Sequence, residues 1–461
     1  MSSTEIHGAA VTGSTNLKRT IGLPGALGIS FHQIVGGGVI ALTGTAIAIT
    51  GGGTPLAYVL ATVLVMLVTV PVAALGAAMP ATGGAYTYAS RLIHPGAGFA
   101  NMWLWTLGNL SLSIYGLAAG EYLNSLFPAL NSTVVAISML VFFYLVNLFG
   151  AALSARLGVI LAVVMLIAFT LYIIAGFLDL QYWSVFTHPI PNGALELFKA
   201  AALLSFAARG GQVVAELGDE LKNPGRTIPI ACLGGTMFAG LLYVLLAMPA
   251  TGVLPLPEVA GKPMSVVAEH VLNPAGFTFF VIGGSFVALI SSLNSNMLWG
   301  TKALLASIED GWFPTKLGAV NRRFGTPHWL LTIMFVIGIA PILMNIDMAN
   351  IANAASALQQ INAVIILIAS IRLRKIFPQA HANSPFKIGY RTHWALLVAG
   401  IAISIWQFML LTSDLTTAVI ISAMTWIALG TVWALIRYRR IGASAAPDQH
   451  PTRTAEITTL A

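Results

Sequence analysis

The sequence of 461 residues is poor in charge and almost free of cysteine. Only 8% of its residues are Asp, Glu, Lys or Arg, whereas soluble domains carry about 25%. The one cysteine, Cys232, excludes an intramolecular disulfide framework and a cysteine-based metal cluster. Alternating ten-residue amphipathic strands are also missing. With 57% hydrophobic residues, the composition predicts an all-α polytopic membrane protein.

Motifs typical of enzymes are missing as well. The sequence has no HExxH pair, no GxSxG elbow, no GxxxxGK[ST] loop and no cysteine–histidine cluster. We therefore expect no catalytic residue, no metal site and no cofactor. Two classes without chemistry stay open, a secondary transporter and a membrane sensor that binds a solute without moving it. The chain shows no appended signalling domain, which favours the transporter.

Twelve apolar segments reach the length of about 20 residues that spans a bilayer. They are residues 25–50, 55–79, 96–123, 132–151, 157–178, 194–218, 227–252, 275–305, 327–345, 351–372, 393–412 and 416–437. An even number of spans places both ends of the chain on one side. We expect a transporter domain over residues 21–437, flanked by polar cytoplasmic tails over 1–20 and 438–461. Residues 1–20 lack the apolar run of a cleavable signal peptide.

The positions of the basic residues predict the orientation. All but four of the 22 Lys and Arg residues fall on the side of the two tails, which the positive-inside rule assigns to the cytoplasm. Lys199 and Lys262 lie on the opposite side, and Arg209 and Lys302 lie at membrane depth. The net charge of +7 is thus explained by topology, and nucleic acid is not an expected partner. The expected location is a prokaryotic inner membrane.

Two of the spans are interrupted by glycine. The first carries Gly36, Gly37 and Gly38 in its middle, and the sixth carries Arg209 followed by Gly210 and Gly211. Each glycine weakens a helix by roughly 1 kcal/mol, and an arginine at bilayer depth costs more unless it meets water or a partner. Single glycines in membrane helices are usually packing contacts, but three in succession do not share one helix face.

The two interruptions occupy corresponding positions if the first ten spans divide into two sets of five. Paired breaks of this kind indicate a transporter site near the bilayer midplane. The free N–H groups of a half-helix attract a carboxylate, and free carbonyls of the preceding half-helix attract an ammonium group. The sequence therefore predicts a binding site between the breaks. Among the loops, residues 264–271 are expected to form a short helix, either capping an opening or simply connecting two spans.

Four stretches, in order, resemble the amino acid–polyamine–organocation superfamily of secondary transporters. They are Gly36-Gly-Gly-Val-Ile40, Pro80-Ala-Thr-Gly-Gly-Ala-Tyr-Thr-Tyr-Ala-Ser-Arg91, Glu220-Leu-Lys-Asn-Pro-Gly-Arg-Thr-Ile-Pro229, and Asp310-Gly-Trp-Phe-Pro314 with Asn321-Arg-Arg-Phe-Gly-Thr-Pro327. The resemblance covers nearly the whole chain. It implies a five-plus-five inverted repeat with broken helices 1 and 6, over about 25–178 and 194–372, and two further helices over 393–437. It also implies alternating-access transport of amino acids or related amines.

The resemblance further implies a substrate site. The amides of Gly37 and Gly38, next to Gly36, would hold a substrate carboxylate. The carbonyls of Ile34, Phe206 and Arg209, next to Gly210, would face its ammonium group, with Phe206 as an aromatic gate.

On the third helix, Trp105, Asn109 and Leu112 share a face at i, i+4 and i+7, and this face matches the family's pocket wall. Asn296 on the eighth helix matches another pocket position. Simpler interpretations are a lipid-interface anchor for Trp105 and interhelical hydrogen bonds for the two asparagines.

Arg209 departs from the family pattern, in which an apolar residue commonly precedes the glycine. Three interpretations are open. The guanidinium pairs with an anionic group of the substrate, it replaces a coupling cation with a fixed charge, or it reaches water or an internal carboxylate such as Glu121 or Glu216. The first favours an acidic amino acid as substrate. A neutral amino acid, an amine or a polyamine is the alternative, although a cationic pocket without an opposing carboxylate disfavours a polycation.

The coupling ion is left open between proton and sodium. Many proton-coupled relatives carry a lysine on the fifth helix, where this chain has Met165. The candidate coupling or gating residues at membrane depth are His32, Glu121, Glu216 and Lys302. A structural histidine, a cytoplasmic charge network of Glu216 with Glu220, and a structural contact of Lys302 are the simpler interpretations.

Overall fold

The structure is a computed structural model that describes residues 19–441, apart from 20, 82, 150–153, 189, 322, 323 and 325. The expected tails, 1–20 and 438–461, thus lie mostly outside the described residues. In the described part the chain is almost entirely helical, and its one β-contact is an isolated bridge between Ile21 and Leu221. The expectation of an all-helical fold is confirmed for these residues.

The first half of the chain contains ten α-helices and one 3₁₀ turn in its described residues. They are α1 (Leu23–Ile34), α2 (Gly37–Thr50), η1 (Gly51–Gly53), α3 (Thr54–Ala78), α4 (Gly84–Leu92), α5 (Pro95–Gly108), α6 (Ser111–Leu126), α7 (Ser132–Phe149), α8 (Ser154–Leu178), α9 (Ser184–Thr187) and α10 (Ala194–Ala208).

The second half begins with two 3₁₀ segments and continues in helices of very different length. They are η2 (Gly211–Glu216), η3 (Gly218–Glu220), α11 (Pro224–Gly252), α12 (Leu256–Val259), α13 (Ser265–Val271), α14 (Pro274–Phe279), the π-helical η4 (Phe280–Phe286), α15 (Val287–Glu309), η5 (Thr315–Gly318), α16 (His328–Leu343), α17 (Met348–Ile376), α18 (Pro378–Asn383), α19 (Tyr390–Ser413) and α20 (Thr417–Ile441).

Seven helical stretches of the described chain are long and apolar enough to cross a membrane. They are residues 37–78, 132–149, 224–252, 274–309, 348–376, 390–413 and 417–438. Two shorter apolar helices cover residues 162–178 and 328–343. The structure is therefore that of a polytopic membrane protein, and the count of twelve spans with its internal repeat stays a prediction.

Three of the predicted spans are divided in the structure. The first becomes α1 and α2, the third becomes α5 and α6, and the sixth becomes α10 with η2. The division of the third span was not expected. Because a turn at Asn109 and Leu110 separates its halves, Leu112 does not line the cavity described below with Trp105 and Asn109, but packs against Gly338 on α16.

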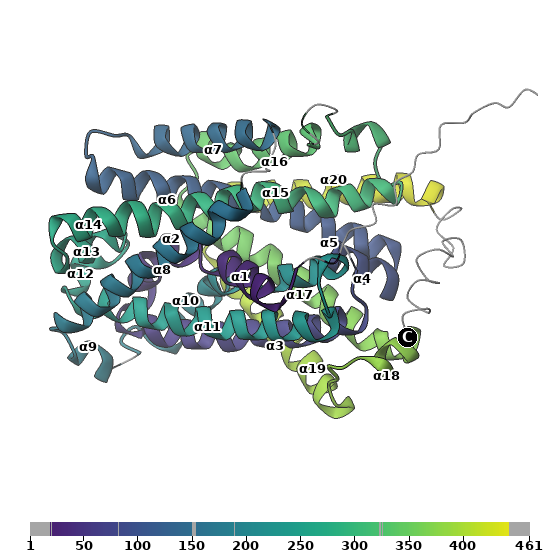
Figure 1. The fold of residues 1–461 in the computed structure, drawn as a ribbon, viewed down its shortest axis with the longest axis horizontal. Helices are drawn as coiled ribbons and strands as arrows, with labels where there is room; N and C mark the ends of the chain where they lie inside the picture. The colour runs from purple at the N-terminus through teal and green to yellow at the C-terminus, as the bar shows by residue number, and fades with distance from the viewer. Residues whose placement is uncertain are drawn as a thin grey trace, which may run out of the picture.

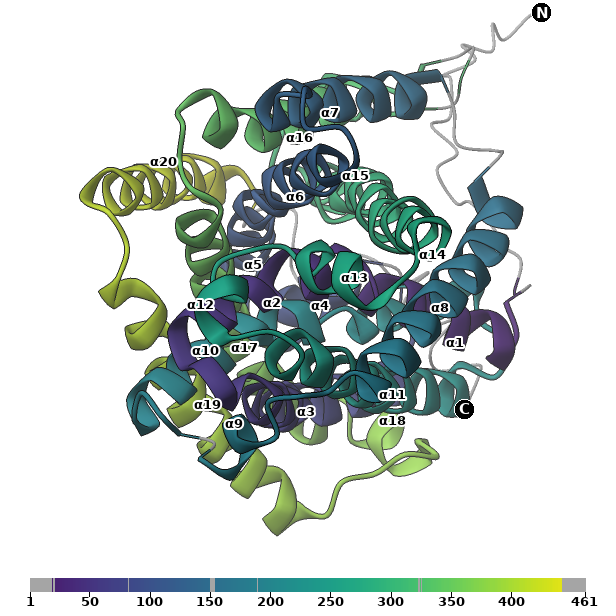
Figure 2. The same cartoon turned by 90° about the vertical axis from the view of Figure 1, so that its left-hand side faces the viewer.

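The helices run between two ends of the molecule, which we call the α13 end and the α4 end (Figure 1). The short helices α9, α12, α13 and α14 gather at the first, and α4, α18 and the last residues of α20 at the second. Viewed onto the α13 end, α12 and α13 lie across the middle of the bundle (Figure 2). The predicted short helix at residues 264–271 is thus present, and its position favours the capping interpretation.

The segment before α13 is held by close contacts. The Met264 amide donates to the Tyr122 hydroxyl at 2.9 Å, and the hydroxyls of Ser125 and Ser265 lie 2.6 Å apart. The Gly261 amide donates to the Gly44 carbonyl at 2.8 Å. A side chain at Gly44 would collide with the backbone of Lys262. Close packing of this segment thus closes the α13 end of the bundle.

Candidate substrate site

The first break lies at Val35 and Gly36, between α1 and α2. It is tightly packed. A Cβ atom on Gly36 would collide with Ser292 on α15, one on Gly37 would collide with the ring of Tyr115, and one on Gly38 would come within 2.7 Å of the Ala207 Cα. These glycines are therefore required by the close approach of three other helices.

Three polar backbone groups of this break already have partners, namely the Gly36 and Gly37 amides and the Ile34 carbonyl. The Gly37 amide donates to the Ser292 hydroxyl at 2.8 Å. The Ile34 carbonyl accepts from the Gly36 amide at 2.9 Å and from the Tyr243 hydroxyl at 2.5 Å. A substrate that used Gly37 or Ile34, as the resemblance implies, would have to displace these groups.

The second break lies at Arg209 and Gly210, between α10 and η2. Gly210 has φ +145°, a conformation that L side chains rarely adopt, and a Cβ there would lie 2.8 Å from the Gln33 carbonyl oxygen. The Phe206 carbonyl accepts from the Arg209 amide at 3.4 Å, which closes the last turn of α10. The chain after the break continues as the 3₁₀ helix η2.

One tyrosine joins the two breaks. The Tyr243 hydroxyl on α11 contacts the carbonyl of Ile34, at the end of α1, and lies 3.2 Å from the carbonyl of Ala207, in the last turn of α10. Its side chain is fully buried. This residue was missed because nothing in the sequence distinguishes it from an apolar packing residue of a long helix.

A cavity of about 120 Å³, enough for several waters or one small solute, adjoins the second break. The residues that line it come from α1, α3, α4, α5, α6, α10, η2, α15 and α17. Among the predicted site residues, those that line it are Trp105, Asn109, Phe206, Arg209, Gly210, Glu216 and Asn296. Those not among its lining residues are Ile34, Gly36, Gly37, Gly38, Glu121 and Lys302.

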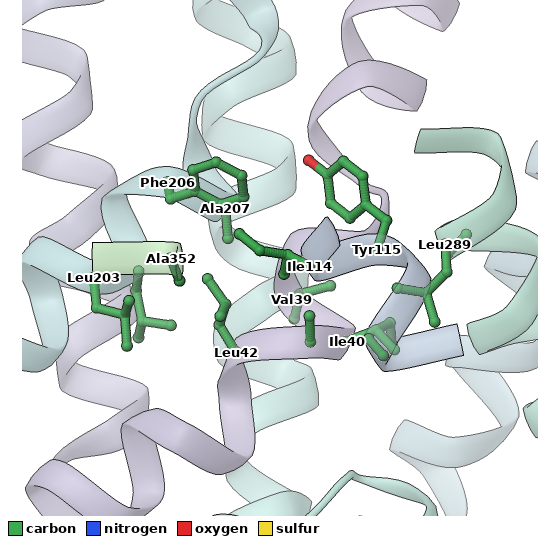
Figure 3. Packing of buried hydrophobic residues seen from close by; sticks show 14 of the residues in the cluster. Val39, Ile40, Leu42, Ile114, Tyr115, Leu203, Phe206, Ala207, Leu289 and Ala352 are labelled. Carbon is green, nitrogen blue, oxygen red and sulfur yellow. The ribbon is translucent and has the colours of Figure 1, made fainter. Parts of the chain in front are cut away.

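The cavity extends towards the α4 end and is bounded on the other side by aromatic packing. Gly84, Ala85 and Tyr88 of α4 contribute to its lining. Phe206 is 6% exposed, and its ring centroid lies 6.3 Å from that of Tyr115. Figure 3 shows these two rings on the same side of a packed layer that includes Val39 and Leu42 of α2. Apolar packing thus separates the cavity from the α13 end.

Arg209 is tied to α17. Its Nη1 donates to the Gln359 carbonyl oxygen at 3.0 Å, and its Nη2 donates to the Gln360 Oε1 at 2.8 Å. In the described part of the chain it forms no ion pair with Glu121 or Glu216. A guanidinium has five donors, so three remain beyond these two bonds.

Carboxamide side chains dominate the polar part of the cavity. Seven of them line it, namely Gln33, Asn101, Asn109, Gln212, Asn296, Gln359 and Asn362. Only Asn109 and Asn296 were predicted. The other five were missed because isolated amides on several different helices form no motif, and only the packing of those helices brings them together.

Glu216 is the carboxylate of the cavity lining. The expectation that the pocket lacks an opposing carboxylate is therefore wrong. A Cβ on Gly84 would collide with the Glu216 side chain, so α4 packs directly on it. Nearby, the Nζ of Lys302 lies 3.8 Å from a carboxylate oxygen of Glu220, which links α15 to η3 at the α4 end. This pair agrees with the structural contact suggested for Lys302, whereas the predicted network of Glu216 with Glu220 stays a prediction.

The remaining candidate gating residues lie elsewhere or are not described. Glu121 is half-buried near the end of α6, next to Tyr122, which contacts the α13 segment. His32 belongs to α1, and its side chain lies outside the described part of the structure. In the described residues no group of His, Cys, Asp and Glu could hold a metal ion.

An interrupted membrane helix beside a polar cavity is typical of a secondary transporter. The amino acid permease family matches residues 25–442 of this chain. The chain therefore belongs to that family, which is part of the amino acid–polyamine–organocation superfamily. Its membership makes it a multi-pass membrane protein with a small-molecule substrate.

The chain is similar over most of its length to amino acid transporters with different named substrates, among them the following three. It is 25% identical to the branched-chain amino acid permease BcaP of Bacillus subtilis, over 92% of this chain and 94% of that protein. It is 27% identical to the serine/threonine exchanger SteT of the same organism, over 78% and 81%. It is 29% identical to the cadaverine/lysine antiporter of Escherichia coli, over 66% and 70%.

Proposed function

We propose that the protein moves a small zwitterionic amino acid across the membrane by alternating access. The cavity beside the second break carries this proposal, because it combines backbone freed by Gly210 with Arg209, a carboxylate and several amides. It is closed towards the α13 end and reaches α4, as one state of an alternating-access cycle requires. The substrate would lie against Phe206, Trp105, Asn109 and Asn296. Opening to the other side would then expose the amides of Gly37 and Gly38.

We place the substrate among neutral amino acids rather than acidic ones. Two of the Arg209 donors already bind α17, and Glu216 opposes a second carboxylate in the same cavity. The substrates after which the three relatives are named are aliphatic, hydroxylated or basic, and none is acidic. Arg209 then supplies a fixed positive charge at the break and binds the substrate carboxylate through its remaining donors.

A basic amino acid or a diamine is the second candidate. The observation in its favour is Glu216, a carboxylate placed in the cavity where an ammonium group would meet it. Proton and sodium both stay open as coupling ions, and Glu216 is the cavity residue best suited to carry a proton. With the α4 end in the cytoplasm of a prokaryotic cell, the basic residues obey the positive-inside rule.

Counterflow in proteoliposomes tests the proposal. Vesicles loaded with one unlabelled amino acid should accumulate the same labelled amino acid from outside, and vesicles with the Arg209→Met protein should accumulate it far more slowly. A thermal-shift screen of neutral, acidic and basic amino acids selects the substrate, because a ligand stabilises the folded state by mass action. A compound that stabilises the protein but never exchanges would identify a sensor and would overturn the transporter proposal.

A further inference from the structure

One wall of the cavity, formed by α5 and α17, is built from uncharged amides. We call it the amide wall and define it as Asn101, Asn109, Gln359 and Asn362. Asn101 is 3% exposed and Asn109 is 4% exposed, so both are shielded from solvent in this state. None of the four carries a charge, so the polar contacts that the wall offers are hydrogen bonds.

The hydrogen bonds within the amide wall leave both donors and acceptors available to a substrate. Asn101 Nδ2 donates to Asn362 Oδ1 at 3.2 Å. Asn109 Nδ2 donates to the Trp105 and Thr106 carbonyls at 3.2 Å, which leaves its Oδ1 as an acceptor. Each carboxamide has two donors and an acceptor with two lone pairs. The wall therefore offers donors on Asn362 and acceptors on Asn101 and Asn109.

The wall is fixed in position by the second break. Arg209 binds the main-chain carbonyl of Gln359 and the side chain of Gln360, which holds α17 against the break. On another side of the cavity α3 contributes only Val68 and Val72. The cavity thus has one hydrogen-bonding wall and one apolar wall, in addition to the charged groups Arg209 and Glu216.

We infer that the amide wall selects a substrate whose neutral side chain both donates and accepts hydrogen bonds, a hydroxyl or a carboxamide, over an aliphatic side chain of the same size. An aliphatic side chain would donate no hydrogen bond to the side-chain oxygens of Asn101 and Asn109, whose NH₂ groups already have partners. Sites built to hydrogen-bond a substrate group reject analogues that lack it. The valines of α3 contact the apolar part of the same side chain. This inference rests on the proposed function and refines its substrate.

Two pairs of nearly isosteric amino acids test the inference on the wild-type protein. Threonine and valine have almost the same shape, as do asparagine and leucine. In counterflow, we expect the polar member of each pair to exchange with at least tenfold higher kcat/KM, which corresponds to about 1.4 kcal/mol. Equal rates within each pair, or faster exchange of the aliphatic member, would overturn the inference while leaving the transporter proposal intact. Exchange of no amino acid at all would instead contradict the proposed function.

Substitution of the wall supplies the second test. Asn101→Leu and Asn362→Leu, alone and together, should bring the threonine-to-valine ratio towards one. The matched control is Gln407→Met, because Gln407 is a buried amide on α19 that bonds Ser205 and does not line the cavity. A purely structural role of the wall would lower both rates equally and leave the ratio unchanged, which would also overturn the inference. The ratio measures selectivity in the folded fraction, so reduced expression does not affect it.

Discussion

The two breaks look alike in sequence and differ in structure. At the first, Gly36–Gly38 are packed against Ser292, Tyr115 and Ala207, and the Gly37 amide already has a partner. At the second, Arg209 and Gly210 face a cavity. The first break therefore acts as a tightly packed contact between helices in this state, whereas the second presents the polar groups. Glycine serves close packing at one and an unusual backbone conformation at the other.

The largest expected effect comes from filling the first break. In Gly38→Ala the new Cβ would lie 2.7 Å from the Ala207 Cα, a backbone atom that cannot move aside cheaply. Overpacking of this kind costs about 1–3 kcal/mol, and we expect amino acid uptake to fall to background with a lowered melting temperature. Gly28→Ala is the control, because nothing lies within 4 Å of its added Cβ. Normal uptake by Gly38→Ala would show that this break is not closely packed during transport.

The second largest loss of uptake is expected from removing the positive charge at the second break. Arg209→Met deletes the donors that bind α17 and face the cavity, and we expect kcat/KM for uptake to fall about 100-fold, the scale of a lost charge-assisted hydrogen bond. Arg209→Lys should recover only part of this, because an ammonium group lacks the planar fork that reaches Gln359 and Gln360 together. Purified protein measured by size-exclusion chromatography should remain folded. An inactive but unfolded Arg209→Met protein would instead assign the residue a structural role.

A smaller loss is expected from the neighbour that positions Arg209. Gln360 is 2% exposed and accepts one guanidinium bond, so Gln360→Met should lower kcat/KM about tenfold through KM. Combined with Arg209→Met, the second substitution should add almost nothing, because interacting residues give non-additive effects. Full additivity in the double-mutant cycle would show that Gln360 acts independently of Arg209.

The smallest effect is expected at the serine that occupies the first break. Ser292→Ala leaves the buried Gly37 amide without its 2.8 Å partner. We expect a stability loss of about 1 kcal/mol and an uptake change of only about threefold, because the substrate carboxylate can take the serine's place in the cycle. Thermal melting with and without substrate measures this. A loss as large as that of Arg209→Met would show that the two breaks contribute equally.

These differences show what the sequence could and could not predict. The positions of both breaks followed from Gly36–Gly38 and from Arg209–Gly210, since adjacent glycines at membrane depth interrupt a helix without sharing one packing face. The sequence did not predict which of the two breaks faces the cavity. That depends on Ser292 and Tyr243, which lie on helices distant in the sequence and bind backbone groups of the first break.

Residues that line the cavity could be predicted only where they belong to a motif or share one helix face. Trp105 and Asn109 share a helix face, so their spacing placed them together. Leu112, three residues further on, was assigned to the same wall and was misplaced by the turn at Asn109 and Leu110. Asn101 and Asn362 are 261 positions apart, and only the folded chain makes them neighbours.

The single thiol of the chain has a practical consequence. Cys232 is fully buried on α11, and its sulfur lies 3.1 Å from the carbonyl of Gly211, the first residue of η2. A thiol-reactive fluorophore can label it only while η2 separates from α11. The native protein, with no engineered cysteine, therefore contains its own reporter of this rearrangement, and the labelling rate with and without amino acid measures how often the second half-helix moves.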